Sequence, residues 1–330
     1  ALVPEHPEPI PVIDTGPSFA METLLAEEER AHELLKLATG PLPSAALRQL
    51  DKVSRRWLAK WENAHLGEID AIANRLRRPG AYFLSVNYEW ACSCRVAPAP
   101  NGRSARLVRV LDWRPPGLGR HVLAARVNGP RGRFVTLTWP GYTGVLTAMA
   151  PGRFSAALNQ APMRKAVGFY ALDWAVCRRR VWTMPHPTPA HLLRSVFENA
   201  VDYADAVARL TNEPISTPAI FSLAGIKAGE TAVIERTETD ARVHRGANVA
   251  ANHWQAPGWR GRSRGQQSAE RAAMMHGVMP DLAPEFSWLA PPVLNGRTRV
   301  VMIADAAEGR LVAQGFEAMR PATAPLDLVA

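Results

Sequence analysis

Cysteine, lysine and long apolar runs are all scarce in this chain of 330 residues. The three cysteines, Cys92, Cys94 and Cys177, are too few for the disulfide framework of a small secreted scaffold. No cluster of His or Cys near Cys92 and Cys94 completes the four ligands of a structural zinc site, so we expect no metal and no other cofactor. No apolar run approaches the ~18 residues of a membrane-spanning helix.

The N-terminal residues show no basic segment followed by an apolar one, so no signal peptide is visible. This favours a cytoplasmic protein. The chain begins without Met, however, which leaves a removed or missing upstream segment open.

Basic residues outnumber acidic ones, 39 to 30, and only five of the basic residues are lysine. Heavy use of Arg, Ala and Pro together is typical of a GC-rich genome. A net charge of +9 would also attract anionic lipid surfaces. No nucleic-acid-binding signature accompanies the charge, and aromatic residues do not alternate with arginines in one stripe, so we expect no nucleic-acid partner.

The periodicity predicts helices and strands in separate groups. Helical patterns cover 22–37 and 44–76, and a strand-like pattern begins at 80–85. Further along, we expect strands through 105–159, helices at 163–178 and 189–211, strands through 217–251, a helix at 268–276 and a hairpin at 298–316. The length allows one or two domains, and the pattern alone predicts an α+β protein with much antiparallel sheet.

Cys92 lies in a stretch that predicts a β-hairpin. It belongs to 88–97, Tyr-Glu-Trp-Ala-Cys-Ser-Cys-Arg-Val-Ala, and an Asn101-Gly102 turn follows. The apolar return stretch then ends in Arg109 and Asp112, which a hairpin would bring back beside Cys92. A thiol, a cation and a carboxylate in one small space suit a cysteine nucleophile.

The same residues resemble the cysteine N-terminal-nucleophile (Ntn) amidases, a family with acid ceramidase, N-acylethanolamine acid amidase and choloylglycine hydrolase. The first two have Cys-Thr-Ser-Ile-Val where this chain has Cys-Ser-Cys-Arg-Val at 92–96, and Gly-Arg-Asn-x-Asp-aromatic where it has Val-Arg-Val-Leu-Asp-Trp at 108–113. The spacing between the two motifs is one residue longer here. The turn at 98–102 is the natural place to absorb that residue.

Two further stretches resemble the family in the same order. Residues 138–147, running on to 154–160, are similar to Gly-Tyr-Val-Gly…Thr-Gly…Phe-Ser…Leu-Asn-Glu. Residues 217–221, followed by 249–254, are similar to a strand that ends in Thr-Asn-Tyr-Asp. The resemblance thus covers roughly residues 10 to 320.

The resemblance implies a four-layer αββα Ntn-hydrolase sandwich with an N-terminal helical segment. It also implies cleavage between Ala91 and Cys92, with residues 1–91 staying bound to a catalytic domain of residues 92–330 in one globular unit. The implied activity is an amidase that hydrolyses N-acyl amides through an acyl-enzyme on Cys92. A fatty acylethanolamide, a ceramide-like lipid and an N-acyl amino acid all remain open as its small-molecule substrate.

Cleavage would give Cys92 a free α-amine, which can take the thiol proton without a catalytic histidine. By resemblance, Arg109 would hold the carbonyl region, Asp112 would orient the amine, and Asn252 would donate an amide N–H to the oxyanion. Gln160 stands where relatives have Glu, so it either donates a hydrogen bond or marks a differently tuned site.

The substrate-binding residues are less well defined. Four aromatic residues are candidate walls for an acyl chain, with an ordinary core role as the alternative: Trp113, Tyr142, Trp139 and Trp254. Four arginines compete for the place of the family's late arginine: Arg260, Arg262, Arg264 and Arg271. We choose Arg264, although a solvated basic loop explains these residues equally well.

Alternatives remain at each step. Cys92 could be a buried strand thiol, and Cys94 competes as nucleophile with a spacing to Arg109 that is one residue short. Arg109 and Asp112 could form a structural ion pair, and Asn252 could be a turn residue. An acyltransferase with the same nucleophile and an uncleaved, non-catalytic binding protein are the rival functions. A Cys-His protease lacks its flanking signature here. Homo-oligomerisation is left open.

Overall fold

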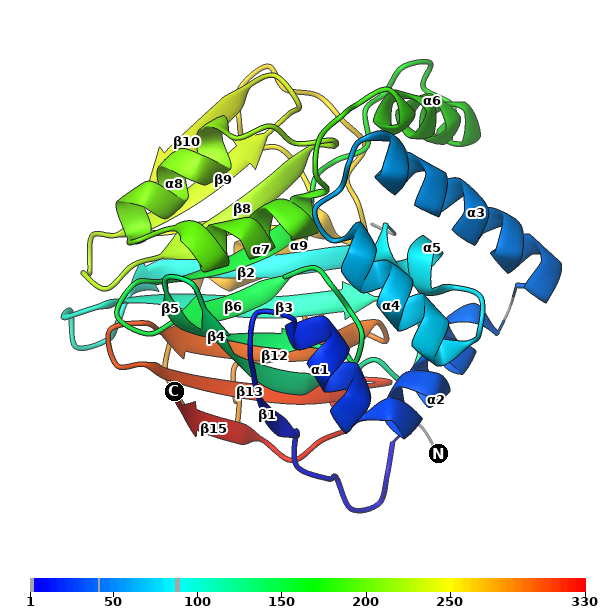
Figure 1. Cartoon of the computed structure of the whole chain (residues 1–330). Coiled ribbons are helices and arrows are strands. Elements are labelled where there is room, and N and C mark those ends of the chain that lie inside the picture. The colour runs from blue at the N-terminus through cyan, green and yellow to red at the C-terminus, as the bar shows by residue number, and fades with distance from the viewer. Residues whose placement is uncertain (1–2, 41, 87–89) are drawn as a thin grey trace.

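The computed structural model describes residues 3–40, 42–86 and 90–330, and Figure 1 shows the whole chain. The N-terminal part is helical, as predicted. Its helices are α1 (Phe19–Ala26), α2 (Glu28–Thr39), α3 (Ser44–Lys60), α4 (Leu66–Leu76) and α5 (Ala81–Ser85). Apolar residues recur on one face of α2, α3 and α4, which lets each helix bury one side.

Two details of this segment correct the sequence-based predictions. Residues 81–85 form α5 and not the start of a strand, because this turn packs against α3 and α4. The single helical pattern over 44–76 is two helices, separated by a turn in which Asn63 Oδ1 accepts from His65 N. Residues 87–89 lie outside the described residues, so the approach to Trp90 is not tested there.

The first sheet has eight strands in the order β1-β4-β5-β6-β7-β8-β9-β10. Their bounds are β1 (Val12–Thr15), β4 (Leu123–Gly129), β5 (Gly132–Thr138), β6 (Thr147–Ala150), β7 (Phe154–Gln160), β8 (Ala219–Ala224), β9 (Thr231–Arg236) and β10 (Ala241–Arg245). All neighbours are antiparallel except β1, which pairs with β4 in parallel.

The second sheet has seven strands in the order β11-β2-β3-β12-β13-β14, with β15 also paired to β13. Their bounds are β11 (Asn248–Ala250), β2 (Trp90–Pro98), β3 (Ala105–Trp113), β12 (Thr298–Asp305), β13 (Arg310–Glu317), β14 (Arg320–Pro321) and β15 (Leu326–Val329). Every one of its pairings is antiparallel.

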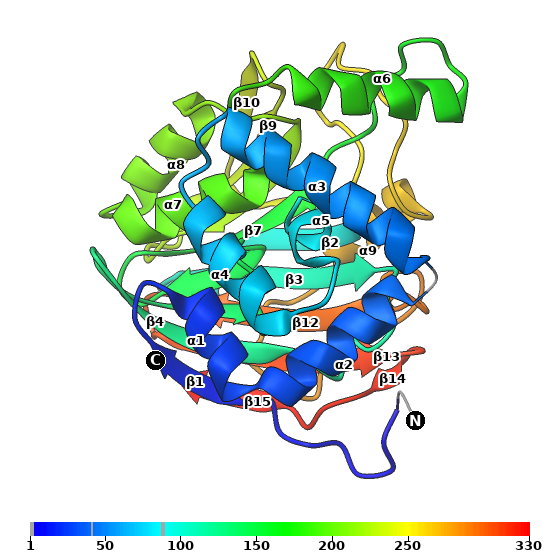
Figure 2. The same cartoon turned by 45° about the vertical axis from the view of Figure 1, so that its right-hand side comes forward.

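The two sheets pack face to face, with β2 and β3 lying against β7 and β8. Helices α7 (Pro189–Asn199) and α8 (Tyr203–Asn212) cover the outer face of the first sheet, and α9 (Ser268–His276) covers the second. The predicted α+β class and the four-layer αββα arrangement are therefore confirmed. Helices α1 to α4 lie together on one side of the two sheets (Figure 2).

The predicted helix over 189–211 is interrupted, because Asp202 caps a new helix by accepting from Asp205 N at 2.8 Å. The predicted helix at 163–178 begins later, as α6 (Tyr170–Trp182). None of the helices in the described part of the chain is both long and apolar enough to cross a membrane.

Candidate active site

The β2–β3 hairpin brings the residues singled out in the sequence together, as predicted. Cys92 pairs with Leu111, and Cys94 pairs with Arg109 on the same face. The strands separate after Pro98, and Gly102 N donates to Ala99 O in the turn that follows. The paired part of the hairpin thus ends before the turn in which we expect the extra residue.

Cys92 is held by its main chain on both sides. Its N–H donates to Asn252 Oδ1 at 2.8 Å, and its carbonyl accepts from an Arg271 guanidinium nitrogen at 2.5 Å. The thiol is fully buried, with Leu158 O at 3.7 Å from Sγ. Burial raises the pKa of the Cys92 thiol to about 12, against the opposing effect of the Arg109 charge. The thiol of the uncut chain is therefore protonated at neutral pH.

The orientation of the Asn252 side chain is fixed by its partners. Oδ1 accepts from Cys92 N and, at 3.0 Å, from Arg271, so this atom is the oxygen. Nδ2 donates to Gln160 O at 2.8 Å. The backbone N–H of Asn252 donates to Ser268 Oγ at 2.9 Å, which ties this residue to the start of α9. One N–H of the Asn252 amide thus points at the end of β7, beside Cys92.

Of the four arginines that compete for the place of the late arginine, Arg271 is the one whose guanidinium contacts the main chain of Cys92. Its guanidinium binds Cys92 O, Asn252 Oδ1 and, at 3.0 Å, Ser93 Oγ. Burial lowers its pKa, yet the guanidinium remains charged at neutral pH. Arg264, the residue chosen from the sequence, contributes its carbonyl to Arg271 at 3.4 Å. The available signal was the helical pattern at 268–276, which distinguishes Arg271 from the arginines of the loop.

Arg109 is completely buried next to the sulfur of Cys94. One guanidinium nitrogen donates to Asn159 Oδ1 at 2.5 Å and lies 3.5 Å from Cys94 Sγ. The other donates to Leu158 O at 2.8 Å. Cys94 Sγ in turn donates to Asn159 Oδ1 at 3.1 Å. Arg109 therefore fixes the end of β7 against the two cysteines and carries positive charge into an otherwise apolar layer.

Asp112 is buried opposite Ala91, the residue before Cys92. It accepts from Thr298 Oγ1 at 2.9 Å and from Asn295 Nδ2 at 2.8 Å. Burial raises the pKa of the Asp112 carboxyl, and these two hydrogen bonds oppose that rise. Arg109 and Asp112 each bind groups other than one another, so the alternative of a mutual structural ion pair has no support in these contacts.

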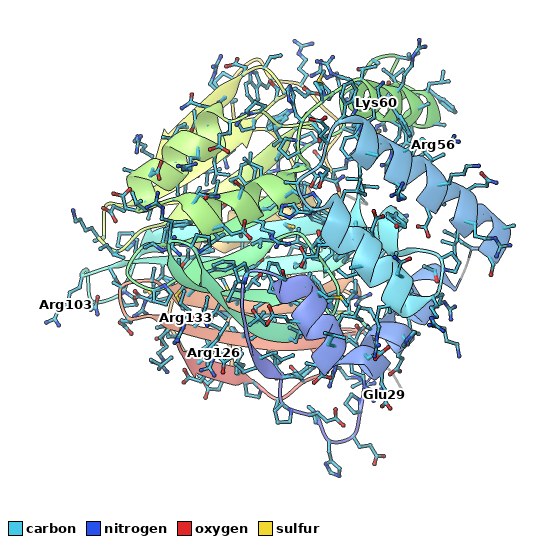
Figure 3. All side chains as sticks on the ribbon, viewed as in Figure 1. Glu29, Arg56, Lys60, Arg103, Arg126 and Arg133 are labelled. Atoms are coloured by element: carbon cyan, nitrogen blue, oxygen red, sulfur yellow. The ribbon has the colours of Figure 1, made fainter. Side chains whose placement is uncertain are left out.

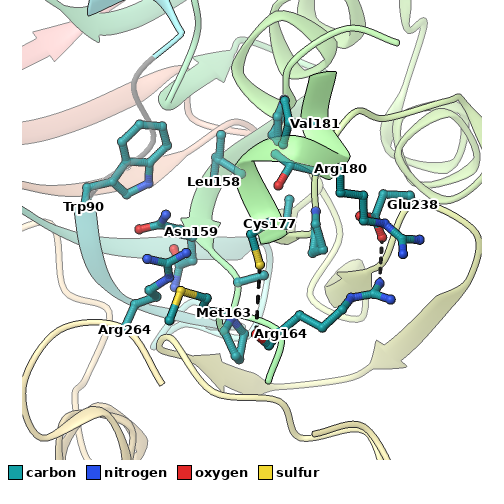
Figure 4. Close-up of a pocket in the computed structure, with 17 residues that line it drawn as sticks. Trp90, Leu158, Asn159, Met163, Arg164, Cys177, Arg180, Val181, Glu238 and Arg264 are labelled. Atoms are coloured by element: carbon teal, nitrogen blue, oxygen red, sulfur yellow. Dashed lines mark hydrogen bonds and ion pairs between the residues drawn. The ribbon is translucent and has the colours of Figure 1, made fainter. Parts of the chain in front are cut away.

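Two cavities share Trp90, which lies two residues before Cys92, in their walls. One, which we call the arginine cavity, has a volume of about 310 Å³ and is lined by Trp90, Ala91, Asp112, Gln160 and four arginines: Arg114, Arg262, Arg264 and Arg297. The other, the α6 cavity, has a volume of about 50 Å³. In Figure 4 it lies between Leu158, Met163 and Val181, with Arg164 and Arg180 paired to Glu238 at its far side.

Three of the four aromatic residues expected to form an acyl pocket do line one cavity. Trp113, Trp139 and Tyr142 contact one another edge to face, with ring centroids 5.4 to 6.2 Å apart. With side chains of α2, α4 and α5 they enclose a cavity of about 80 Å³, which we call the apolar cavity. Trp254 lies elsewhere and packs on Trp259 at 5.0 Å.

Sequence comparison identifies relatives of this chain. Human acid ceramidase is 32% identical over 134 residues, which are 38% of this chain and 33% of that protein. Acid ceramidase of the whale Balaenoptera acutorostrata scammoni is 34% identical over 104 residues, 31% of this chain and 25% of that protein. The chain thus spans a quarter to a third of the length of these relatives. The acid ceramidases are therefore relatives of this chain in sequence over about a third of its length.

Similarity to solved structures is lower. The Caenorhabditis elegans N-acylethanolamine-hydrolyzing acid amidase ortholog aligns over 65% of this chain and 93% of its own, at 21% identity and a TM-score of 0.46. A variant of the conjugated bile acid hydrolase of Clostridium perfringens aligns over 72% and 92%, at 10% identity and a TM-score of 0.39. No protein-family model matches the chain.

The contacts of Arg271 predict a large loss of stability when this side chain is shortened and neutralised. Arg271→Met would leave the buried Cys92 carbonyl without this donor, and an unsatisfied buried polar group costs about 1–3 kcal/mol. We expect a fall of roughly 2–4 kcal/mol in the free energy of unfolding, measured with urea. Arg103→Met is the matched control, because Arg103 extends into solvent from the hairpin turn (Figure 3). Equal effects of the two substitutions would contradict this account.

Proposed function

We propose that the protein is a cysteine Ntn amidase that hydrolyses the C–N bond of N-acyl amides through an acyl-enzyme on Cys92. The observation that carries the proposal is the pair of hydrogen bonds at the main chain of Cys92, whose N–H donates to Asn252 and whose carbonyl accepts from Arg271. An ordinary buried strand thiol has no need of a buried arginine and an asparagine side chain on its own peptide groups. The acid ceramidases, by their name, act on an amide of the same class.

The first step of the proposed function is cleavage of the bond between Ala91 and Cys92. Cys92 Sγ attacks the Ala91 carbonyl, the C–N bond breaks, and the thiol proton passes to the departing nitrogen. Water then hydrolyses the thioester, its oxygen going to the Ala91 carboxyl and its proton to the sulfur. The Asn252 oxygen already accepts from the scissile nitrogen at 2.8 Å, which places that nitrogen for departure as an amine.

Cleavage supplies the base that the buried thiol lacks. The free α-amine of an N-terminal residue has a pKa of about 8, so a useful fraction is neutral at pH 7 and accepts the thiol proton. Asn252 Oδ1 remains the acceptor for this amine, and the Asp112 carboxylate stabilises the ammonium that forms. One N–H of Asn252 Nδ2 donates to Gln160 O at the end of β7, and the other is the proposed oxyanion donor.

The acyl chain is assigned to the apolar cavity. Trp90 contacts Trp113 with ring centroids 5.3 Å apart, and Trp113 lines the apolar cavity while Trp90 lines the other two. Removal of the Trp90 indole after cleavage would connect the apolar cavity with the surroundings of Cys92. The C-terminal end of the 1–91 fragment thus acts as a plug, while helices α2, α4 and α5 of the same fragment stay as cavity walls.

The cleavage step predicts two fragments that begin and end at a defined bond. The purified protein should separate on a denaturing gel into residues 1–91 and 92–330, with intact masses that place the cut before Cys92. Cys92→Ala should give one band of the full 36.1 kDa. Cys94→Ala is the matched control and should still cut. Cleavage that survives in Cys92→Ala and stops in Cys94→Ala would move the nucleophile to Cys94.

The apolar cavity predicts a dependence on acyl length. Each methylene that becomes buried contributes about 0.8 kcal/mol, so kcat/KM should rise by roughly fourfold per added methylene until the cavity is full. Ala38→Phe, which fills the cavity from α2, should reduce kcat/KM for a C16 amide at least about tenfold and leave a C4 amide nearly unaffected. Ala208→Phe on the exposed side of α8 is the control. A flat profile in acyl length would reject this assignment.

The role of Asp112 predicts a loss of turnover without a loss of fold. Asp112→Asn keeps an oxygen acceptor toward Thr298 but removes the negative charge next to the new ammonium. We expect kcat to fall at least about tenfold, with little change in the urea midpoint. The acidic limb of the pH–rate profile should move to lower pH, because the α-amine loses its anionic neighbour and its pKa falls. An unchanged kcat and pH profile would make Asp112 a structural residue.

A further inference from the structure

The arginine cavity gathers positive charge from three separate parts of the chain. Arg114 directly follows β3, Arg297 directly precedes β12, and Arg262 and Arg264 lie in the loop between β11 and α9. The fold thus brings four guanidinium groups to a single cavity of about 310 Å³. No sequence motif connects these residues, and the proposed cleavage and acyl transfer use none of the four side chains.

The described residues of the cavity wall do not neutralise this charge. Among them the single carboxylate is Asp112, which is already bound by Thr298 and Asn295. Arg262 donates to Gly168 O and lies 4.0 Å from Asp173. Arg114 and Arg297 have no side-chain hydrogen bond or ion pair within residues 3–40, 42–86 and 90–330. Such a cavity carries a positive potential that attracts anions.

The position of the cavity assigns it to one half of the substrate. Trp90, Ala91 and Gln160 form the wall next to Cys92, so a group in the cavity lies within reach of an amide held at the nucleophile. The acyl half is assigned to the apolar cavity on the far side of Trp113. The half that remains for the arginine cavity is the amine half.

We infer that the arginine cavity binds a carboxylate on the amine half of the substrate, and that the preferred substrates are N-acyl amino acids. This inference rests on the proposed amidase function. A guanidinium group matches a carboxylate with two parallel hydrogen bonds, and Arg114 and Arg297 are the two whose side chains are available for that pairing. A hydroxyl on the amine half, as in an acylethanolamide, gains no charge pairing at the same place.

The test compares two amides that share the acyl chain and differ at the end of the amine half. N-lauroylglycine should have a kcat/KM at least about tenfold above that of N-lauroylethanolamine, since a hydrogen bond to a charged group contributes about 1.5–3 kcal/mol. In Arg297→Gln and in Arg114→Gln the ratio of the two values should fall toward one, mainly through a higher KM for N-lauroylglycine. Arg103 is exposed in the turn at the opposite end of the β2–β3 hairpin from Trp90, so Arg103→Gln should keep the wild-type ratio.

The two proposals fail in different ways. Equal hydrolysis of both amides, or a ratio unchanged in the Arg297 and Arg114 variants, overturns the carboxylate site and leaves the amidase standing. Hydrolysis of neither amide refutes the amidase, and calorimetry on the wild-type protein, which then consumes neither ligand, decides the site by binding alone. At least about tenfold tighter binding of N-lauroylglycine than of N-lauroylethanolamine, lost in Arg297→Gln, supports the site. Equal or absent binding of the two overturns it.

Discussion

The main chain of Cys92 is the point on which the site depends. Its N–H is bound by Asn252, which follows β11, and its carbonyl is bound by Arg271 of α9. These two contacts join the first residues of β2 to the outer helix layer and fix the peptide bond on each side of the cysteine. Asn252 also donates to Gln160 O at the end of β7, so its side chain connects β2 of the second sheet with β7 of the first.

Burial determines the order of events at this site. With Trp90 and Ala91 in place, the Cys92 thiol has no contact with solvent, and its pKa is raised to about 12. The uncut chain thus holds a protonated, enclosed thiol, and the proposed cleavage removes both conditions, because it supplies an amine and frees the Trp90 indole. An apolar cavity toward the N-terminal helices and an arginine-lined cavity then remain on different sides of the proposed nucleophile.

The sequence was sufficient to predict the β2–β3 hairpin and most of the helices and strands around it. The period-two pattern on both sides of the Asn101-Gly102 turn determines which side chains share a face. The sequence alone therefore predicts that Arg109 lies beside the cysteines. Residues 80–85 were misread because a single helical turn carries too short a pattern, and packing on α3 decides its conformation. Arg271 lies in the helix predicted at 268–276, but the sequence does not show that its side chain, unlike those of the loop arginines, is buried against Cys92.

The arginine cavity could not be predicted from the sequence for a similar reason. Its charges come from residues that are far apart along the chain, and only the pairing of β3 with β12 brings Arg114 and Arg297 to one edge. A basic loop at 260–264 looks like any solvated surface segment until the opposite wall is known.

The central claim is that Cys92 carries the acyl group during turnover. Peptide mass spectrometry after rapid acid quenching of the protein with an N-acyl amide measures this directly. The account predicts an added acyl mass on the peptide that begins at Cys92, as a thioester that hydroxylamine releases, and none in Cys92→Ala. An adduct on Cys94 or Cys177, or turnover with no covalent adduct under conditions where deacylation limits the rate, would contradict it.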